Sequence, residues 1–284
     1  MLLKKLIKNC PTNIQKTNIK GLAIDSRKVK KDYIFFALKG NKLDGETFID
    51  QAIKKGAKII ICSKKSKIKK NKIIIIKVTN IRKYIADICK KFFHKKPKNI
   101  FAVTGTNGKS SVADFFFQIL KLNKIPVASI GTLGIKKNSS VKKILTTSPD
   151  IITLHEELVK IKKTGIDNVI IEASSHGLNQ GRLNGINFTA GVFTNFSQDH
   201  LDYHKSMKNY FNAKMILLSK LLREKKSLIT DSKIKEFKKI KKIARKKNLK
   251  IITIKKNLYH NSNQIKNLIG AFQIKNLLMA IEVA

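Results

Sequence analysis

The pattern in this chain most able to do chemistry is a short glycine turn that carries a lysine and a hydroxyl. Gly105 and Gly108 bracket the turn, and Lys109 and Ser110 follow them at the start of an apolar helical stretch. Backbone N–H groups and a helix start attract an anion, lysine adds a positive charge, and serine can ligate Mg²⁺. The common P-loop has a further glycine where this chain has Val103. We interpret the turn as a nucleotide triphosphate site; the alternative is an ordinary glycine-rich strand-to-helix turn.

Acidic and imidazole side chains gather after two later apolar segments. Glu172 ends the segment 168–173, and the segment 190–194 leads to Asp-His-Leu-Asp-Tyr-His at 199–204. A carboxylate at the carboxyl end of a strand beside a phosphate turn suits Mg²⁺-ATP, because Mg²⁺ prefers oxygen ligands. A polar loop often contains such a cluster without any metal. Two successive strands that end this way nevertheless favour one shared crevice.

Two further features have an ordinary explanation that is as good as a functional one. Lys214 lies in an apolar helical stretch, but it is one of 55 lysines and the sequence alone does not single it out. Residues 25–27 and 40–45 place polar groups after two strands of the N-terminal part. They can hold a sugar or a nucleotide diphosphate, or they can be simple turns.

The elements that must position these residues alternate between strand and helix. From residue 99 onward this alternation predicts a doubly wound, mostly parallel α/β sheet, in which ligands bind at the carboxyl ends of the strands. The expected strands lie near 100–104, 127–130, 168–173, 190–194, 227–230 and 250–254, and the expected helices near 109–122, 151–163, 207–222, 233–247 and 273–283.

A smaller α/β unit is expected before this sheet. Residues 95–98 contain Pro97 and three lysines, which is typical of a linker. We therefore expect an N-terminal domain over 1–97 and a central domain over 98–284. The smaller unit should have strands near 22–24, 33–38, 59–62 and 73–78, and helices near 48–55 and 81–94.

The net charge of +42 invites a nucleic-acid interpretation, but its origin argues against one. Only five of the 60 basic residues are arginine, whereas a selected phosphate-binding surface would use more arginine and interleaved aromatics. The three cysteines form no CxxC pair, and no apolar run approaches the roughly 20 residues that span a bilayer. A cytoplasmic protein without a membrane segment is expected.

Taken together, the sequence resembles the Mur ligases of peptidoglycan synthesis, and among them the MurE type, which adds the third residue of the stem peptide. The most specific stretch is Glu-Ala-Ser-Ser-His-Gly-Leu-Asn-Gln-Gly-Arg at 172–182. Thr-Gly-Thr-Asn-Gly-Lys-Ser at 104–110 and the Asp-His-Leu-Asp segment are shared more widely, by Mur ligases and folylpolyglutamate synthases. The other matching stretches lie at 24–27, 35–40, 44–49, 146–149, 213–214 and 270–278, in the family's order.

The resemblance implies a role for each candidate residue. Lys109, Glu172, His200 and Lys214 would be catalytic, with Lys214 carbamylated to an N6-carboxylysine. Mg²⁺ would be held by Ser110, Glu172, His200 and Lys214. ATP would be bound by Thr106, Asn107, Gly108, Lys109, Ser110, Ser111 and Asn276. The substrate UDP-N-acetylmuramoyl dipeptide would be bound by Ser26, Asn41, Lys42, Leu43, Thr146, Thr147, Ser174, Gln180 and Arg182.

The implied activity is that of an ATP-dependent acid–amino-acid ligase with ATP and Mg²⁺ as cofactors. It would join a diamino acid, meso-diaminopimelate or L-lysine, to the D-glutamate side chain of UDP-N-acetylmuramoyl-L-alanyl-D-glutamate through an acyl phosphate. A carbamate on Lys214 would need a depressed lysine pKa, which burial favours. The expected partners are these substrates, with no specific nucleic acid and no membrane, and the chain is expected to be monomeric.

The chain also departs from the family pattern. The family has a third, C-terminal domain that selects the amino acid, and no stretch here matches its motif. We therefore expect a truncated central domain. The chain would bind the UDP precursor and ATP but would not carry out the ligation alone. The alternatives are a basic P-loop protein that binds nucleic acid and a Mur ligase remnant without activity.

Overall fold

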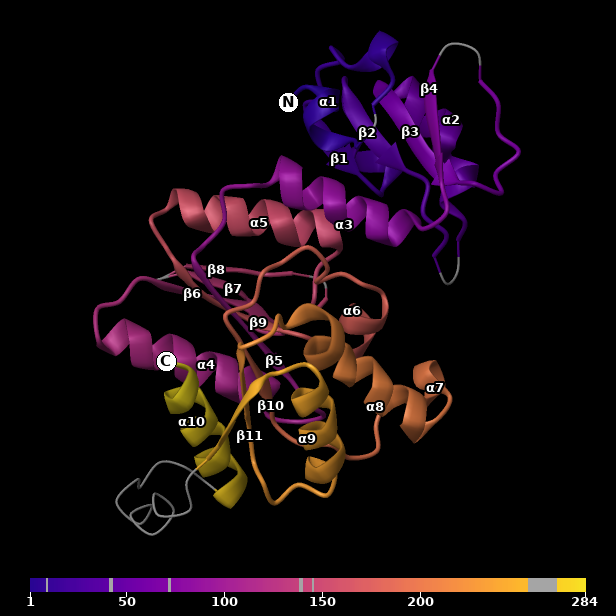
Figure 1. Cartoon of the computed structure of the whole chain (residues 1–284). Coiled ribbons are helices and arrows are strands. Elements are labelled where there is room, and N and C mark those ends of the chain that lie inside the picture. Colours follow the sequence, from indigo (N-terminus) through magenta and orange to yellow (C-terminus); the bar gives the residue numbers. More distant parts are fainter. Residues whose placement is uncertain (9, 41–42, 71–72, 138–139, 145, 255–269) are drawn as a thin grey trace. The chain divides into compact units, whose positions relative to one another are not determined.

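The computed structural model describes residues 1–8, 10–40, 43–70, 73–137, 140–144, 146–254 and 270–284. Within them the chain forms two compact units, Met1–His94 and Lys95–Ala284, each built around one β-sheet (Figure 1). The division falls at the start of the expected linker at 95–98.

The first unit is a four-stranded parallel sheet in the order β1-β2-β3-β4. Apolar side chains of the strands, such as Phe35 and Ile60, pack with Ile49 and Ala52 of helix α2. The strands are β1 (Gly21–Ala23), β2 (Tyr33–Phe36), β3 (Ala57–Ser63) and β4 (Ile74–Val78), and the helices are α1 (Leu3–Leu6), α2 (Ile49–Lys54) and α3 (Ile81–Phe92).

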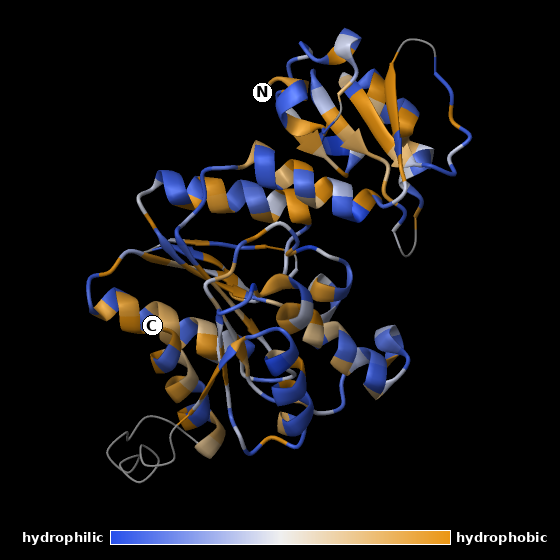
Figure 2. Cartoon of the chain, in the orientation of Figure 1, coloured by the Kyte–Doolittle hydropathy of each residue, from blue (hydrophilic) through white to orange (hydrophobic). Residues whose placement is uncertain are grey.

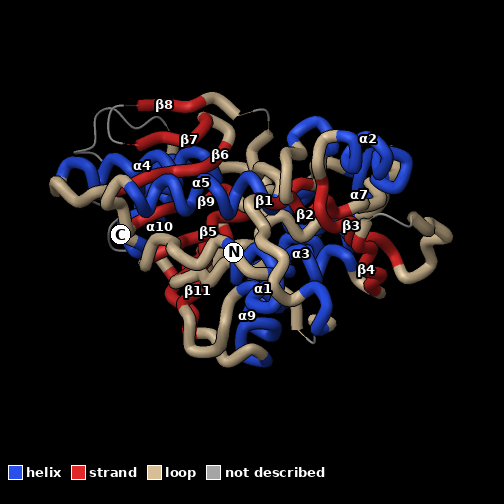
Figure 3. The backbone as a smooth tube through the Cα atoms, turned by 90° about the horizontal axis from the view of Figure 1, so that it is seen from above, coloured by secondary structure: helices blue, strands red, loops and turns tan. Residues whose placement is uncertain are grey.

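The second unit contains a sheet of eight described strands in the order β12-β11-β10-β5-β9-β6-β7-β8. The six strands from β12 to β6 are parallel, and β7 and β8 are antiparallel at one edge (Figure 3). The strands are β5 (Asn99–Thr104), β6 (Val127–Gly131), β7 (Gly134–Lys137), β8 (Ser140–Lys142), β9 (Asn168–Glu172), β10 (Ala190–Phe193), β11 (Ser227–Thr230) and β12 (Lys250–Thr253). The helices are α4 (Lys109–Leu122), α5 (Ile151–Lys163), α6 (Ser175–Asn179), α7 (Leu201–His204), α8 (Met207–Ile216), α9 (Phe237–Lys246) and α10 (Ala271–Val283), with a π-helix (Leu217–Leu221) after α8.

Both faces of this sheet are buried, which explains why its central strands are apolar throughout. Successive side chains of β5 alternate between two cores: Ile100 and Ala102 face one, Phe101 and Val103 the other. The first core includes residues of α5 and α9, and the second includes residues of α4 and α10. Figure 2 shows that the central strands are largely apolar, whereas α5 and α9 carry many hydrophilic residues.

The predicted mostly parallel, doubly wound α/β sheet is confirmed, and its six predicted strands end within one residue of the observed ones. The helix predicted from residue 233 instead begins at Phe237, because the Asp231 carboxylate accepts the Lys233 N–H and forms a turn first. The helix predicted over 207–222 becomes a π-helix after Ile216. The β7–β8 hairpin was not predicted, since its lysine-rich sequence lacks an apolar alternation. None of the helices in the described ranges is long and apolar enough to span a membrane.

Candidate nucleotide and metal site

The glycine turn lies where predicted, between the end of β5 and the first residue of α4. Gly105 and Gly108 have φ angles of +144° and +82°, in the region that favours glycine. A Cβ on Gly105 would overlap the Thr194 hydroxyl, and one on Gly108 would overlap the side chain of Asn276. Among the described residues, no side chain caps the start of α4. Its first N–H groups therefore suit an anionic ligand.

The turn is held in shape by residues that follow β10. The Thr194 hydroxyl donates to the Asn107 carbonyl at 2.6 Å, and the Asn107 N–H donates to Asn195 Oδ1 at 2.9 Å. The Thr106 hydroxyl accepts the Ser197 N–H at 3.0 Å. Since β10 pairs directly with β5, the two strand ends form one edge of the site.

Lys109 folds back over the turn. Its ammonium donates to the carbonyls of Thr106 at 2.7 Å and Gly105 at 3.1 Å. Burial lowers the Lys109 pKa, and the negative charges of Glu172 and Asp199 partly oppose that shift. The Lys109 side chain is thus held beside the phosphate turn.

Glu172 is a buried carboxylate, 2% exposed, at the carboxyl end of β9. It accepts hydrogen bonds from the Ser110 hydroxyl at 2.9 Å, the Thr132 N–H at 2.9 Å and the Thr132 hydroxyl at 3.1 Å. Thr132 was missed by the sequence reasoning. The available signal was its position directly after a strand, β6, that ends at the same edge of the sheet.

One pocket of about 260 Å³ unites the predicted residues of the turn with those of later elements. Its lining includes His200 and Lys214 from beyond β10 and Thr147 and Ser174 from two other loops. Glu172 reaches this pocket through its contact with Ser110. The whole lining consists of Thr106, Asn107, Gly108, Lys109, Ser110, Ser111, Thr132, Thr147, Ser174, Ser175, His200 and Lys214.

Lys214 is not an ordinary surface lysine: it is 1% exposed. Its ammonium donates to the Gly105 carbonyl at 2.6 Å and lies 4.5 Å from the centre of the Tyr210 ring. Burial and, to a lesser degree, the charge of Lys109 lower the Lys214 pKa to about 7. A large fraction of this amine is therefore neutral near pH 7, the form that reacts with CO₂.

The donor set of the pocket fits Mg²⁺ better than a softer metal. Glu172 and Ser110 offer oxygen atoms in contact with each other, beside the uncapped start of α4. Mg²⁺ commonly binds one or two carboxylates together with substrate phosphates and water. In the described part of the chain, no three His, Cys, Asp or Glu side chains cluster as a metal site. Phosphate oxygens would therefore have to complete the coordination.

Ser148 links the predicted residues on the other side of the pocket, although the sequence reasoning did not select it. Its hydroxyl donates to the main-chain carbonyl of Glu172 at 2.9 Å and lies 3.1 Å from the Ser174 hydroxyl. Its carbonyl accepts from the Thr146 hydroxyl at 3.0 Å and from Arg182 at 2.6 Å. Arg182 also donates twice to Gln180 Oε1, at 2.7 and 3.0 Å.

The remaining predicted residues do not line this pocket. Asn276 is buried on α10, where it borders Gly108 and donates to Gln273. In the first unit Ser26 is buried and donates to Gln51 at 2.5 Å, and Leu43 is 66% exposed. The predictions for Asn41 and Lys42 lie outside the described residues.

A pocket of about 520 Å³ in the first unit is lined by other residues. It lies over the ends of β2, β3 and β4 and includes Ser63, Lys65 and Arg82, but neither Ser26 nor Leu43. The sequence reasoning missed both cations: lysine is too abundant in this chain to mark a site, and no motif distinguishes Arg82.

Comparison with known proteins identifies the family. Residues 103–267 match the model described as "Mur ligase middle domain", and residues 18–93 match "Mur ligase family, catalytic domain". The UDP-N-acetylmuramoyl-L-alanyl-D-glutamate–2,6-diaminopimelate ligases of Rickettsia conorii and Brucella melitensis are each 40% identical to the chain, over 232 and 212 residues. These matches cover 80% and 75% of this chain but 48% and 43% of the relatives, so the chain spans about half their length.

Solved structures agree on the fold. A structure of a UDP-N-acetylmuramoyl-L-alanyl-D-glutamate–2,6-diaminopimelate ligase matches the whole chain and 63% of its own length, with a TM-score of 0.82 and 24% identity. The MurF ligase of Thermotoga maritima, in complex with ADP, matches 82% of this chain and 50% of its own, with a TM-score of 0.56 and 17% identity. Neither the fold nor the relatives support the alternative of a nucleic-acid-binding P-loop protein. Because the middle-domain match alone covers more than half of the sequence, the chain belongs to the Mur ligase family.

Proposed function

We propose that the chain supplies the nucleotide and acceptor sites of an ATP-dependent ligase of peptidoglycan precursor synthesis. The acceptor would be UDP-N-acetylmuramoyl-L-alanyl-D-glutamate and the added residue a diamino acid, diaminopimelate in preference to L-lysine. The relatives that share 40% identity carry the name of this activity. The observation that carries the proposal is the single pocket lined by Lys109, Ser110, His200 and Lys214, with Glu172 bonded to Ser110.

The reaction would begin when a carboxylate oxygen of the D-glutamate side chain attacks the γ-phosphorus of ATP. The bond from that phosphorus to the bridging oxygen breaks, ADP leaves, and an acyl phosphate forms. The neutral amine of the diamino acid then attacks the acyl carbon, and phosphate leaves as the amide forms. In this scheme the first N–H groups of α4 and the Lys109 ammonium stabilise the negative charge on the transferred phosphoryl group.

Mg²⁺, when bound, would supply further positive charge beside the phosphates. Ser110 and Glu172 would hold it, with His200 and Lys214 at the same pocket. Thr132 would keep the Glu172 carboxylate oriented through two hydrogen bonds. A carbamate on Lys214 would replace a buried cation with an anion next to the phosphate turn, and the lowered Lys214 pKa supports that modification.

On the acceptor side, Thr146, Thr147, Ser174, Gln180 and Arg182 would bind the muramoyl dipeptide. In the first unit the UDP group would be bound by the loops of Ser26 and 41–43. The pocket with Lys65 and Arg82 offers cations for the same anionic group. The chain would act in the cytoplasm as a monomer, with no specific nucleic-acid partner.

Binding is the appropriate test, because no residue of this chain is assigned to the incoming diamino acid. We expect the polypeptide to bind a non-hydrolysable ATP analogue with Mg²⁺, and UDP-N-acetylmuramoyl-L-alanyl-D-glutamate, both measured by isothermal titration calorimetry. Lys109→Ala should weaken nucleotide binding about tenfold or more, since a charge-assisted hydrogen bond is worth about 1.5–3 kcal/mol. Wild-type protein that binds neither ligand would refute the proposal.

A further inference from the structure

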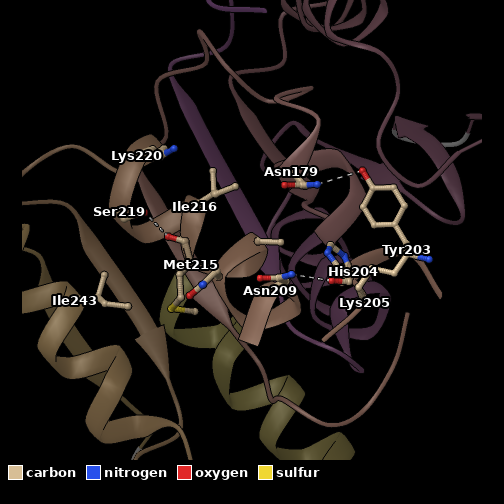
Figure 4. A pocket seen from close by; sticks show the side chains of 12 residues that line it. Asn179, Tyr203, His204, Lys205, Asn209, Met215, Ile216, Ser219, Lys220 and Ile243 are labelled. Carbon is tan, nitrogen blue, oxygen red and sulfur yellow. Dashed lines mark hydrogen bonds between the residues drawn. The ribbon is translucent and has the colours of Figure 1, made fainter. Parts of the chain in front are cut away.

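Tyr203 lies next to the candidate site but lines none of its pocket, and its hydroxyl makes an unusual pair of contacts. It accepts the side-chain amide N–H groups of Asn179 and Gln180, each at 3.2 Å. These two residues belong to α6 and its C-terminal end, whereas Tyr203 belongs to α7. Figure 4 shows the Asn179 amide directed at the Tyr203 hydroxyl, among the side chains that line a neighbouring pocket.

The contacts continue from Gln180 to Arg182. While the Gln180 amide nitrogen donates to Tyr203, its oxygen accepts both Nε and Nη2 of Arg182. An amide has one donor end and one acceptor end, so the two contacts fix its orientation jointly. The remaining Arg182 nitrogen, Nη1, donates to the Ser148 carbonyl at 2.6 Å, beside the pocket that holds Ser174. The guanidinium plane is thus set by a chain that begins at the Tyr203 hydroxyl.

The ring of Tyr203 is held by contacts other than those of its hydroxyl. It packs against the His176 ring at a tilt of 41°, with centroids 4.1 Å apart, and His176 in turn lies 4.8 Å from the His200 ring. Replacing Tyr203 by phenylalanine removes the acceptor of two hydrogen bonds and leaves this stacking surface in place.

We infer that Tyr203 is a positioning residue of the acceptor site: its hydroxyl fixes Gln180, and through Gln180 it orients Arg182 toward an anionic group of the bound substrate. The inference rests on the proposed function, in which Arg182 binds the muramoyl dipeptide. Tyr203 itself touches neither substrate nor nucleotide. Tyr203 also connects α6 with α7, which begins directly after His200. Its hydroxyl therefore links the segment of Arg182 to the segment of His200.

The decisive variant is Tyr203→Phe, with Tyr33→Phe as the matched control. Tyr33 is the first residue of β2, whereas Ser26 and Leu43 follow the carboxyl ends of β1 and β2. Since these strands are parallel, Tyr33 lies at the opposite strand ends of the sheet. We expect Tyr203→Phe to weaken the binding of UDP-N-acetylmuramoyl-L-alanyl-D-glutamate about tenfold, as measured by calorimetry. A loss of this size corresponds to the energy of one or two hydrogen bonds. Affinity for the Mg²⁺-bound ATP analogue should stay at the wild-type value, and the melting temperature should fall by only about 2–4 °C. Tyr33→Phe should leave both affinities unchanged.

A double-mutant cycle shows whether Tyr203 acts through Gln180. If it does, Tyr203→Phe combined with Gln180→Ala should bind the acceptor no more weakly than Gln180→Ala alone. Additive losses in the double variant, or a Tyr203→Phe affinity within twofold of wild type, would overturn the inference.

A readout of the arginine itself keeps this test separate from that of the proposed function. In the ¹H–¹⁵N spectrum, the Nε–H signal of Arg182, assigned through Arg182→Lys, should shift or broaden in Tyr203→Phe without any ligand. An unchanged signal contradicts the positioning role. Should wild-type protein fail to bind the acceptor, the acceptor part of the proposed function fails, and this spectrum still decides whether Tyr203 orients Arg182.

Discussion

The ammonium of Lys214 donates to the carbonyl of Gly105 at 2.6 Å, so a buried lysine from α8 contacts the first residue of the phosphate turn. A cation in this position costs solvation energy, which the low Lys214 pKa of about 7 reflects. The contact joins two segments 109 positions apart in the chain and makes the turn sensitive to the charge of one side chain.

The first prediction concerns the pH dependence of stability. Between about pH 7 and the ordinary lysine pKa of 10.5, Lys214 is protonated in the unfolded chain and neutral in the folded one. The unfolded state then binds more protons, so this residue makes the free energy of unfolding rise with pH across that window. Lys214→Met should lack this contribution. At pH 7 the variant should unfold at a higher urea concentration than wild type, and this difference in midpoint should shrink from pH 7 to pH 10. A constant difference across that range would contradict the pKa shift; Lys220→Met, on the neighbouring π-helix, is the control.

The second prediction concerns acid sensitivity. His204 is 5% exposed, its Nε2 has no hydrogen-bond partner in the described part of the chain, and burial lowers its pKa to about 4. His176, His200 and Lys214 add positive charge around it, and Asp202 opposes them. Between pH 6.5 and 4 the unfolded chain binds the extra proton, so stability should fall as the pH is lowered through this window.

His204→Phe should lose that part of the acid sensitivity. Urea unfolding at pH 7, 6, 5 and 4 measures it, with His94→Phe in the first unit as the comparison. If the midpoint of His204→Phe falls with acid as steeply as that of wild type, His204 is not the group responsible.

The third prediction separates backbone strain from steric overlap in the phosphate turn. Gly108 and Gly165 have nearly equal φ angles, +82° and +81°. A Cβ would overlap Asn276 at Gly108, whereas it would meet nothing within 4 Å at Gly165. Gly165→Ala should cost about 1 kcal/mol of unfolding free energy, the strain alone. Gly108→Ala should cost more and should also lose affinity for the ATP analogue; equal costs would show that Asn276 moves freely.

The fourth prediction tests the oriented carboxylate. Glu172→Gln keeps the shape but replaces one acceptor oxygen with an amide that donates, which would face the hydroxyls of Ser110 and Thr132 while the remaining oxygen accepts the Thr132 N–H. We expect a loss of about 1 kcal/mol in stability, because hydrogen bonds to a charged carboxylate are replaced by weaker neutral ones. The Mg²⁺ dependence of nucleotide binding should also be lost, as measured by titrating Mg²⁺ into protein with a fluorescent ATP analogue. Glu156→Gln, an exposed residue of α5, should change neither quantity.

The sequence predicted those features whose chemistry is local. Glycine, lysine and serine in succession define the turn, and the rule that parallel strands end at one edge brought Glu172 and His200 to it. Thr132 and Ser148 were missed because a loop hydroxyl becomes informative only when its partner is known. Their partners are Glu172 and Arg182, 40 and 34 residues away.

Lys214 could be placed only by the structure or by resemblance. The buried residues of α8 do not form a regular apolar stripe, since Tyr210, Ala213, Lys214 and Met215 are all buried. Among 55 lysines, nothing in the local sequence says which one faces inward. The β7–β8 hairpin was missed because only Gly134 and Ile135 of β7 are buried and all of β8 is exposed, which leaves no apolar alternation to recognise.

The dependence of the phosphate turn on residues after β10 has a consequence for how the protein forms. Thr106 and its partner Ser197 are 91 positions apart. The phosphate turn of the nascent chain therefore emerges before the residues after β10 that hold it in shape. Contacts of such long range form late, after the local helices. The newly made polypeptide should therefore acquire affinity for nucleotide abruptly, once β10 has paired with β5.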